Sequence, residues 1–254
     1  IGRGKMSVVV IGDRAVGKSR MGLALAEPSE EPKVQVIEPD YQTLKDEYIN
    51  VDTGGMTPTR DIYKRPFKIK VELSTKRIIE SVWIDTPGEI YDLEWQIEHP
   101  HAWKEFKETL NQSLGIILLL HPYQEQVKPT LIDSTDSIFA LDRETLLPAH
   151  KWKVDLVNWM KFLRENCNQV NYILICLNKA DLFCSNLDTV GKNFQSYPSY
   201  KRQDEALKYF TAAQIEIEKY NRKDRPFQFF ITCVKNRSLL ELPWIYLSPY
   251  ILYS

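Results

Sequence analysis

Short apolar runs alternate with longer amphipathic segments along this chain. Six runs have the length and composition of strands, and they span residues 8–11, 67–73, 78–84, 115–120, 172–177 and 227–231. The last three of these runs are almost wholly apolar, which suits strands buried on both faces. The pattern therefore predicts an α/β domain with a mostly parallel sheet covered by helices on both faces.

The segments between these runs predict the helices. Four of them have the length and pattern of a helix, and they span residues 18–26, 95–112, 151–166 and 200–222. Trp152, Trp159 and Phe162 recur on one face of the third segment, which indicates core packing. Residues 74–77 separate two strand runs and predict a hairpin turn.

Two polar stretches interrupt this alternation. Residues 27–50 contain Pro28, Pro32 and Pro39, and residues 122–150 contain several aspartates and prolines. We expect both stretches to be insertions or mobile loops. Neither has enough apolar residues for a core of its own, so we expect residues 1–254 to form a single domain.

Composition narrows the class of protein. The 254 residues are 43% hydrophobic and 26% charged with a net charge of -1, so no overall field attracts nucleic acid or an anionic membrane. The four cysteines show no Cys-x-x-Cys spacing, which favours reduced thiols in a cytoplasmic protein. We see no signal peptide and no apolar stretch of about 20 residues, and expect no direct membrane anchor.

A phosphate-binding loop follows the first predicted strand. Residues 12–19 read Gly-Asp-Arg-Ala-Val-Gly-Lys-Ser and lead into the helix predicted at 18–26. Glycines let the main chain wrap closely around an anion with its N–H groups pointing inward. In such a loop Lys18 reaches the terminal phosphates and the Ser19 hydroxyl ligates Mg2+. The motif indicates a nucleoside triphosphate without specifying the base.

Two later motifs specify the nucleotide further. Asp85 ends a predicted strand and can hold Mg2+ through water, while Gly88 can offer its main-chain N–H to a γ-phosphate. Asn178-Lys179-Ala180-Asp181 follows another strand. The Asp181 carboxylate can accept hydrogen bonds from N1–H and the exocyclic amine of guanine, and adenine has no such pair of donors. Both motifs lie at carboxyl ends of strands, where ligands bind in open α/β sheets.

Together these motifs resemble those of the Ras-like small GTPases, in the translation-factor class of phosphate-loop GTPases. The resemblance covers about residues 7–236 outside the two insertions, and the family's Thr-Ser-Ala-Lys motif is looser here, as Thr232-Cys233-Val234-Lys235. It implies a three-layer, doubly wound fold with one antiparallel edge strand, and bound GTP or GDP with Mg2+. The residues it assigns to the nucleotide are Gly12, Asp13, Arg14, Ala15, Val16, Gly17, Lys18, Ser19, Arg20, Gly88, Asn178, Lys179, Asp181, Cys233, Val234 and Lys235.

The switch and catalytic residues are implied by the same resemblance. Members carry a threonine that ligates Mg2+ with the phosphate-loop serine; Thr59 follows a proline, as in Ras, which favours it over Thr57. Glu89 stands where the family has a glutamine that orients the attacking water. Arg14 stands where a small residue is usual; it either supplies charge to the γ-phosphate or turns into solvent.

These observations predict a guanine-nucleotide switch that hydrolyses GTP slowly, with Lys18, Glu89, Thr59 and Arg14 as catalytic candidates. The alternative is a GTP-binding interaction module without hydrolysis, which Glu89 favours. In both cases we expect a protein effector or activator at the switch regions. In that region we expect the side chains of Trp95 and Trp103 to pack in the core; the alternative is that they form an exposed surface for a partner.

The ends of the chain differ from those of a free-standing small GTPase. Residue 1 is Ile1, and residues 238–254 contain Pro243, Pro249 and many aromatic residues. We expect this tail to replace the family's final amphipathic helix, and the domain to belong to a larger multidomain protein.

Overall fold

The computed structural model of the protein describes residues 7–13, 15–49, 63–72, 76–85, 93–132 and 146–251. Its strands form a single sheet in the order β2-β3-β4-β1-β5-β6-β7. The strands are β1 (Ser7–Gly12), β2 (Val34–Glu38), β3 (Tyr63–Glu72), β4 (Lys76–Asp85), β5 (Gly115–Leu120), β6 (Tyr172–Leu177) and β7 (Phe227–Ile231).

Five neighbouring strands of this sheet, β4, β1, β5, β6 and β7, run parallel. β1 lies at the centre, where Val10 is opposite Trp83 of β4 and Ile117 of β5. The carboxyl ends of the five strands therefore meet at one edge of the sheet, as the sequence predicted. This edge carries the candidate site.

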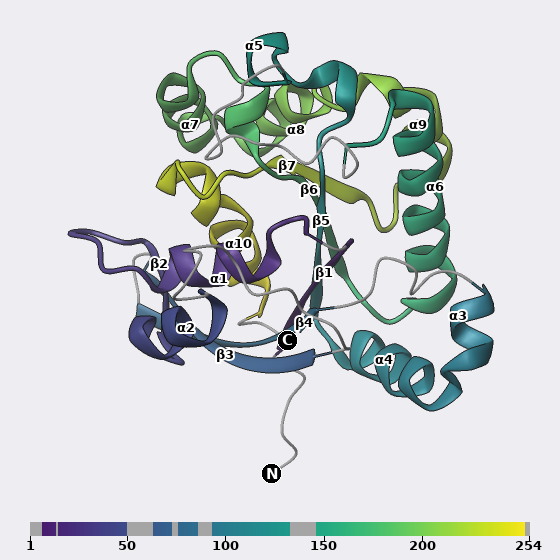
Figure 1. Cartoon of the computed structure of the whole chain (residues 1–254), viewed down its shortest axis with the longest axis horizontal. Coiled ribbons are helices and arrows are strands. Elements are labelled where there is room, and N and C mark those ends of the chain that lie inside the picture. The colour runs from purple at the N-terminus through teal and green to yellow at the C-terminus, as the bar shows by residue number, and fades with distance from the viewer. Residues whose placement is uncertain are drawn as a thin grey trace.

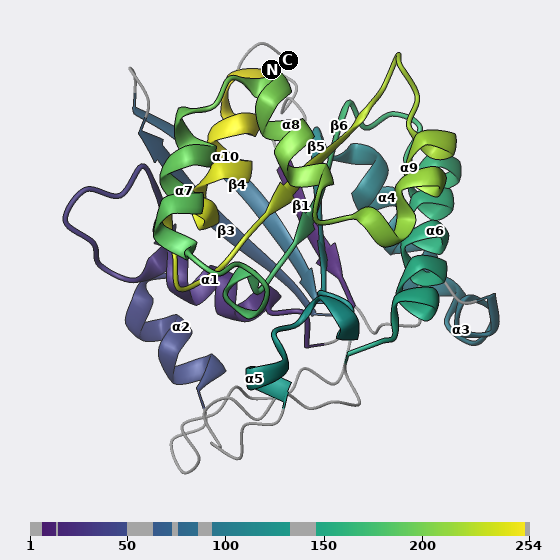
Figure 2. The ribbon, with the colours of Figure 1, turned by 90° about the horizontal axis from the view of Figure 1, so that it is seen from above.

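Helices cover both faces of the sheet (Figures 1 and 2). One face is covered by α1 (Lys18–Ala26) and α10 (Arg237–Ile251), and the other by α4 (Pro100–Gln112) and α6 (Ala149–Asn166). The remaining α-helices are α2 (Tyr41–Tyr48), α3 (Leu93–Glu98), α5 (Pro129–Ile132), α7 (Leu187–Ser196), α8 (Ser199–Leu207) and α9 (Gln214–Tyr220). The α/β class and its mostly parallel sheet are confirmed.

The core follows the apolar runs of the sequence. Every residue of β5 is buried, and so are all the residues of β6 after Tyr172. Trp152, Trp159 and Phe162 of α6 pack in the same core, which confirms their predicted role. Strands buried on both faces supply the largest apolar area, and this explains why their bounds were predicted so closely.

The position of the antiparallel strand differs from the prediction. β3 pairs antiparallel with both β4 and β2, so it lies one place in from the edge, and β2 is the edge strand. β2 belongs to the stretch 27–50, which we expected to be an insertion or a mobile loop. Val34 and Val36 turn their side chains into the core, and α2 follows in the same stretch. Two buried valines were too weak a pattern to predict a strand.

The tail contains a helix where none was expected. α10 spans Arg237–Ile251 with Pro243 and Pro249 inside it. Proline lowers helix propensity by about 3 kcal/mol, but burial of an apolar face offsets this cost. The buried residues on that face include Leu239, Leu240, Leu242, Trp244 and Leu247. Pro249 has no N–H to donate to the carbonyl oxygen of Ile245, four residues earlier. The Ser248 hydroxyl donates to this oxygen instead, at 3.1 Å.

Two predicted helices are broken in the structure. The segment 95–112 divides into α3 and α4, and Pro100 is the first residue of α4. Proline suits this position because an N–H group at the first residue of a helix makes no hydrogen bond within the helix. The segment 200–222 divides into α8 and α9, with buried Phe210 and Ala213 between them. A periodic pattern alone did not reveal either break.

Two residues of α10, Arg237 and Glu241, form an ion pair with each other and also bind the main chain of the edge strand. Arg237 Nε donates to Glu241 Oε1 at 2.7 Å, and its Nη1 donates to the Ala24 carbonyl oxygen at 2.6 Å. Arg237 Nη2 also donates to the Val34 carbonyl oxygen, and Glu241 Oε1 accepts from the Val34 N–H at 3.2 Å. Glu241 is only 3% exposed. The last helix therefore binds the end of α1 and the start of β2.

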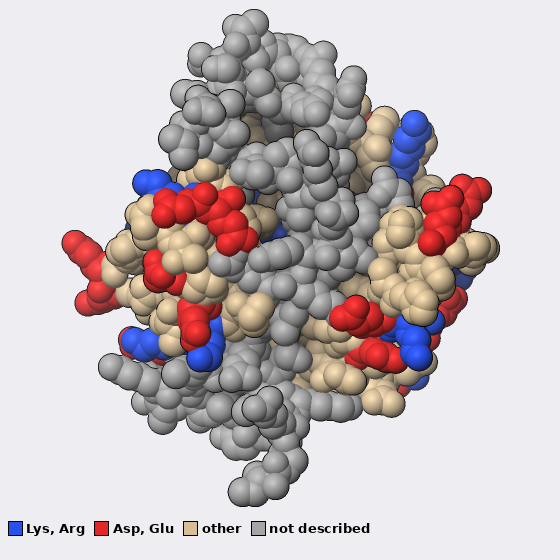
Figure 3. Space-filling view, turned by 60° about the horizontal axis from the view of Figure 1, so that its bottom comes forward, with Lys and Arg blue, Asp and Glu red and all other residues tan. Residues whose placement is uncertain are grey.

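On the face in Figure 3, acidic and basic side chains both occur on the described surface. None of the described helices has the length and apolar character needed to cross a bilayer. The four cysteines, Cys167, Cys176, Cys184 and Cys233, are buried and free, which confirms the expectation of reduced thiols.

Candidate functional site

Three described residues of the loop between β1 and α1 have positive φ angles. Gly12 and Gly17 have φ angles of 149° and 101°, and Ala15 has a φ of 58°. A Cβ on Gly12 would lie closer than 3.0 Å to the main-chain oxygen of Leu119 in β5. Glycine is therefore required at position 12 by both backbone conformation and space.

Lys18 lies across this loop. Its Nζ donates to the carbonyl oxygens of Gly12 at 2.7 Å and Asp13 at 2.8 Å, and the residue is 5% exposed. The N-cap residue of α1 is Gly17, which has no side chain that could cap the helix beginning at Lys18. The uncapped helix end and the lysine charge both favour an anion at this loop.

A tryptophan from α6 holds the same loop from the other side. Trp159 Nε1 donates to Asp13 Oδ1 at 3.0 Å, and Trp159 is fully buried. The sequence predicted Trp159 as core but gave no sign of this hydrogen bond. It links two residues that are distant in sequence, so no local pattern could have revealed it.

Asn178 joins the phosphate loop to the later motifs. Its Nδ2 donates to the Val16 carbonyl oxygen at 2.8 Å, and its Oδ1 accepts from the Thr232 hydroxyl at 3.0 Å. Its side chain also lies against Gly17, where an added Cβ would be 2.9 Å from Nδ2. Asn178 is 2% exposed. Its role is therefore to hold three loops together.

Asp181 is held by two residues of the loop after β7. Its Oδ1 accepts from the Cys233 thiol at 3.2 Å, and its Oδ2 pairs with Lys235 Nζ at 2.7 Å. Burial, and then the charge of Asp181, raise the pKa of Cys233 to about 11, so the thiol remains a donor at neutral pH. The resemblance assigns Cys233 and Lys235 to the nucleotide, and the structure adds these contacts of their side chains with Asp181.

Lys179 is the second residue of the Asn-Lys-x-Asp motif, directly after Asn178. It adopts a left-handed conformation with a φ of 60°, which is uncommon for a residue with a side chain. Burial lowers its pKa, and this effect is partly offset by Asp181, while Arg20 of α1 lowers the pKa further. Arg20 and Asp181 therefore both lie within electrostatic reach of Lys179.

The predicted Mg2+ ligands are described only in part. Ser19 is the second residue of α1. Asp85 is the last residue of β4 and lies two residues after Trp83, which pairs with Val10 of β1. The strand register thus brings the main chain of Asp85 to the end of β1, beside the phosphate loop. A hydroxyl and a carboxylate are the oxygen donors that Mg2+ prefers. The remaining candidates, Arg14, Thr57, Thr59, Gly88 and Glu89, lie outside the described residues.

An open groove lies between α3, α4 and α6. It has a volume of about 600 Å³, and its lining includes Leu93, Trp103, Lys107, Lys161 and Phe162. Trp103 packs against Phe162 with 5.4 Å between ring centroids, whereas Leu93 and Ile97 are 68% and 69% exposed. Trp103 is therefore a partly buried side chain that packs against the core, whereas the exposed side chains Leu93 and Ile97 belong to α3.

A scan against protein-family models and a search of curated proteins gave no match for this chain.

Proposed function

We propose that this chain is a guanine-nucleotide-binding domain that binds GTP and GDP with Mg2+ and hydrolyses GTP slowly. The observation that carries the proposal is the hydrogen bond from Asn178 to Val16. It joins the phosphate-loop motif to the Asn-Lys-x-Asp motif across β5, which separates their strands in the sheet. The order of the motifs and their common sheet edge support a Ras-like, phosphate-loop type of fold.

Each residue then has a distinct part in binding. Lys18 would exchange its contacts with loop carbonyls for the β- and γ-phosphates, as the main-chain N–H groups of residues 12–19 surround them. Ser19 and Thr59 or Thr57 would ligate Mg2+, with Asp85 acting through water. Mg2+ would supply charge neutralisation of the phosphates.

Base recognition depends on freeing the Asp181 carboxylate. Lys235 is exposed and holds only Oδ2, so guanine can replace this ion pair at small cost, while the Cys233 thiol keeps Oδ1 in place. Guanine N1–H and its amine would then donate to Asp181. Lys179, partly desolvated beside Asp181, would lie against the base.

The hydrolytic step is in-line attack of water on the γ-phosphorus. The bond to the β–γ bridging oxygen breaks, and inorganic phosphate leaves GDP behind. Main-chain groups near Thr59 and the Glu89 carboxylate would position the water, and Arg14 would stabilise the developing charge. A glutamate lacks the amide donor of the usual glutamine, so we expect slow turnover.

The substitution at Glu89 also favours a second candidate, a GTP-binding module that recruits a partner without hydrolysis. The exposed side chains Leu93 and Ile97 on α3, a few residues after Gly88, supply an apolar surface for such an effector or activator. In this case GTP affinity is retained and turnover is absent.

Competition binding tests the nucleotide assignment. We expect labelled GDP to be displaced by GTP but not by ATP. Asp181→Asn should weaken GTP binding at least about tenfold and favour xanthosine triphosphate, because an amide donor suits the 2-oxo group of xanthine. Asp204→Asn, at an exposed position, is the matched control. Equal affinities for ATP and GTP would overturn the guanine assignment.

Phosphate release under single-turnover conditions separates the two candidates. The parent chain should release phosphate faster than Lys18→Ala, and Glu89→Gln should release it faster still. A parent rate equal to that of Lys18→Ala, with GTP affinity retained, would leave only the interaction module.

A further inference from the structure

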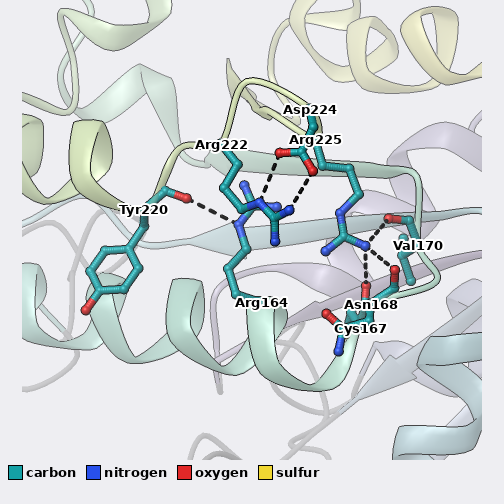
Figure 4. A network of polar contacts seen from close by, with 8 residues as sticks. All are labelled: Arg164, Cys167, Asn168, Val170, Tyr220, Arg222, Asp224 and Arg225. Atoms are coloured by element: carbon teal, nitrogen blue, oxygen red, sulfur yellow. Dashed lines mark hydrogen bonds and ion pairs between the residues drawn. The ribbon is translucent and has the colours of Figure 1, made fainter.

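Three arginines converge at the sheet edge opposite the phosphate loop (Figure 4). Arg164 lies in the last turn of α6, and Arg222 and Arg225 belong to the segment between α9 and β7. β7 begins at Phe227 beside this cluster, whereas the nucleotide motifs follow its other end. The cluster is therefore separate from the proposed nucleotide site.

The two arginines of the loop are held in different ways. Arg225 Nη1 donates to the carbonyl oxygens of Cys167 at 3.4 Å, Val170 at 3.5 Å and Asn168, and thereby fixes the turn after α6. Arg222 donates from Nε and Nη2 to the two carboxylate oxygens of Asp224, at 3.0 and 2.6 Å. The side chains of Arg222 and Asp224 are 56% and 61% exposed. This pair is therefore free to rearrange.

Arg164 is incompletely satisfied. Its Nε donates to the Tyr220 carbonyl oxygen at 3.2 Å, and its guanidinium lies 3.8 Å from the centroid of the Phe227 ring. Among the described residues, Nη1 and Nη2 have no hydrogen-bond acceptor, and both atoms are buried. A buried, unpaired charged donor costs several kcal/mol in general, so an acceptor at this place would be strongly favoured.

The local charges point to the kind of acceptor. The three arginines share a single carboxylate of this loop, that of Asp224. Burial first, and then the charges of Arg225 and Arg222, lower the pKa of Arg164 to about 10, and Asp224 offsets this only in part. Arg164 therefore remains charged at neutral pH, and the cluster has an excess of positive charge.

We propose that this arginine cluster binds a phosphate group, either as inorganic phosphate or as a small phosphate monoester. A phosphate dianion offers oxygens in the geometry that guanidinium groups recognise, and it balances two positive charges where a carboxylate balances one. Asp224 occupies the position of such a ligand on Arg222. Its ion pair with Arg222 is exposed and therefore weak, so Asp224 and Arg222 can turn together and open Arg164 to the anion.

The test must exclude the phosphate loop, which also favours anions. We would use the full chain carrying Lys18→Ala and follow the ¹⁵N-labelled arginine Nε–H signals by NMR during titration. The titrants are inorganic phosphate, glycerol phosphate and, at equal ionic strength, chloride. Phosphate but not chloride should shift the signals of Arg164 and Arg222. A stronger response to glycerol phosphate would identify a monoester as the ligand, and a stronger response to phosphate would identify the free ion.

Three variants make the result decisive. Asp224→Asn removes the competing carboxylate and should tighten phosphate binding about threefold or more. Arg222→Ala and Arg164→Met should each weaken it at least about tenfold, as expected for loss of a charge-assisted hydrogen bond. Arg222 and Asp224 are exposed, so their variants fold even if Arg164→Met does not. Weaker binding in Asp224→Asn, or unchanged binding in Arg222→Ala, would overturn the proposal without bearing on nucleotide binding.

Discussion

The side-chain amide of Asn178 donates to the main-chain oxygen of Val16 at 2.8 Å, although the two residues are 162 positions apart. The same side chain accepts from Thr232 at 3.0 Å. A single buried amide thus fixes the phosphate loop, the loop after β6 and the loop after β7 relative to one another. This contact joins the three loops that carry the candidate site.

Asn178→Ala should therefore reduce both stability and nucleotide affinity. It leaves the Val16 carbonyl and the Thr232 hydroxyl buried without their partner, at a cost of about 2–4 kcal/mol. Thermal unfolding without nucleotide and GDP titration measure the two effects. Asn171→Ala, at an exposed position, should change stability by less than about 0.5 kcal/mol. Equal effects of the two variants would show that the amide does not hold the loops.

Alanine substitutions at two glycines should distinguish a clash with the main chain at a positive φ from a contact with a side chain that can move. Gly12→Ala places Cβ against the main chain of Leu119 at a positive φ and should cost about 3 kcal/mol or more. In Gly115→Ala the nearest atom is Leu247 Cδ2 at 3.2 Å, on a side chain that can move. We expect this variant to remain within about 1 kcal/mol of the parent. Denaturant unfolding of both variants checks the difference.

Buried thiols should make the protein less stable in alkali. Burial raises the pKa of Cys167 to about 12, an effect that Arg225 partly offsets, and the pKa of Cys233 rises to about 11. The folded state therefore keeps protons that the unfolded state releases near pH 9. Each thiol contributes stability that is complete below pH 9 and is lost at up to about 1.4 kcal/mol per pH unit as the pH rises toward its folded pKa.

The slope of unfolding free energy between pH 9 and pH 10.5 measures this effect. Cys167→Ala removes one titrating thiol and should reduce the slope, whatever its effect on stability at pH 7. An unchanged slope would mean that Cys167 does not titrate differently in the two states.

The buried ion pair of α10 predicts a contrast with a surface pair. Arg237→Ala leaves Glu241 charged and buried and should cost about 3–5 kcal/mol. Lys208→Ala breaks the exposed pair with Glu205 and should cost less than about 1 kcal/mol. Hydrogen exchange should show β2 losing protection first in Arg237→Ala. Protection that is lost evenly across the sheet would contradict a local role for this arginine.

The predictable part of the fold is the part with a strong local pattern. The strands at 115–120, 172–177 and 227–231 have the predicted bounds because nearly all of their residues are apolar and buried. β2 was missed because only Val34 and Val36 enter the core. α10 was missed because its prolines oppose a helix, and only the tertiary burial of residues such as Trp244 outweighs them.

The part of the candidate site that could be predicted is likewise the part encoded by short local motifs. The spacing of Lys18, Asn178 and Asp181 follows from motifs that are short in sequence, and strand order brings them to one edge. The contacts of Trp159 with Asp13 and of Cys233 with Asp181 join distant elements, and no periodicity encodes them. Sequence patterns identified the candidate ligand-binding residues, and the fold revealed contacts that hold them in place.

The contacts of Arg237 and Glu241 have a consequence for the order of assembly. They tie the main chain of Val34 to residues more than 200 positions later. During synthesis the outermost strand therefore emerges long before its anchor exists, and the edge of the sheet stays open until the final helix docks. Closing so long a loop is slow, so we expect this helix to dock late in folding and its removal to uncover the outer edge of β2 at Val34.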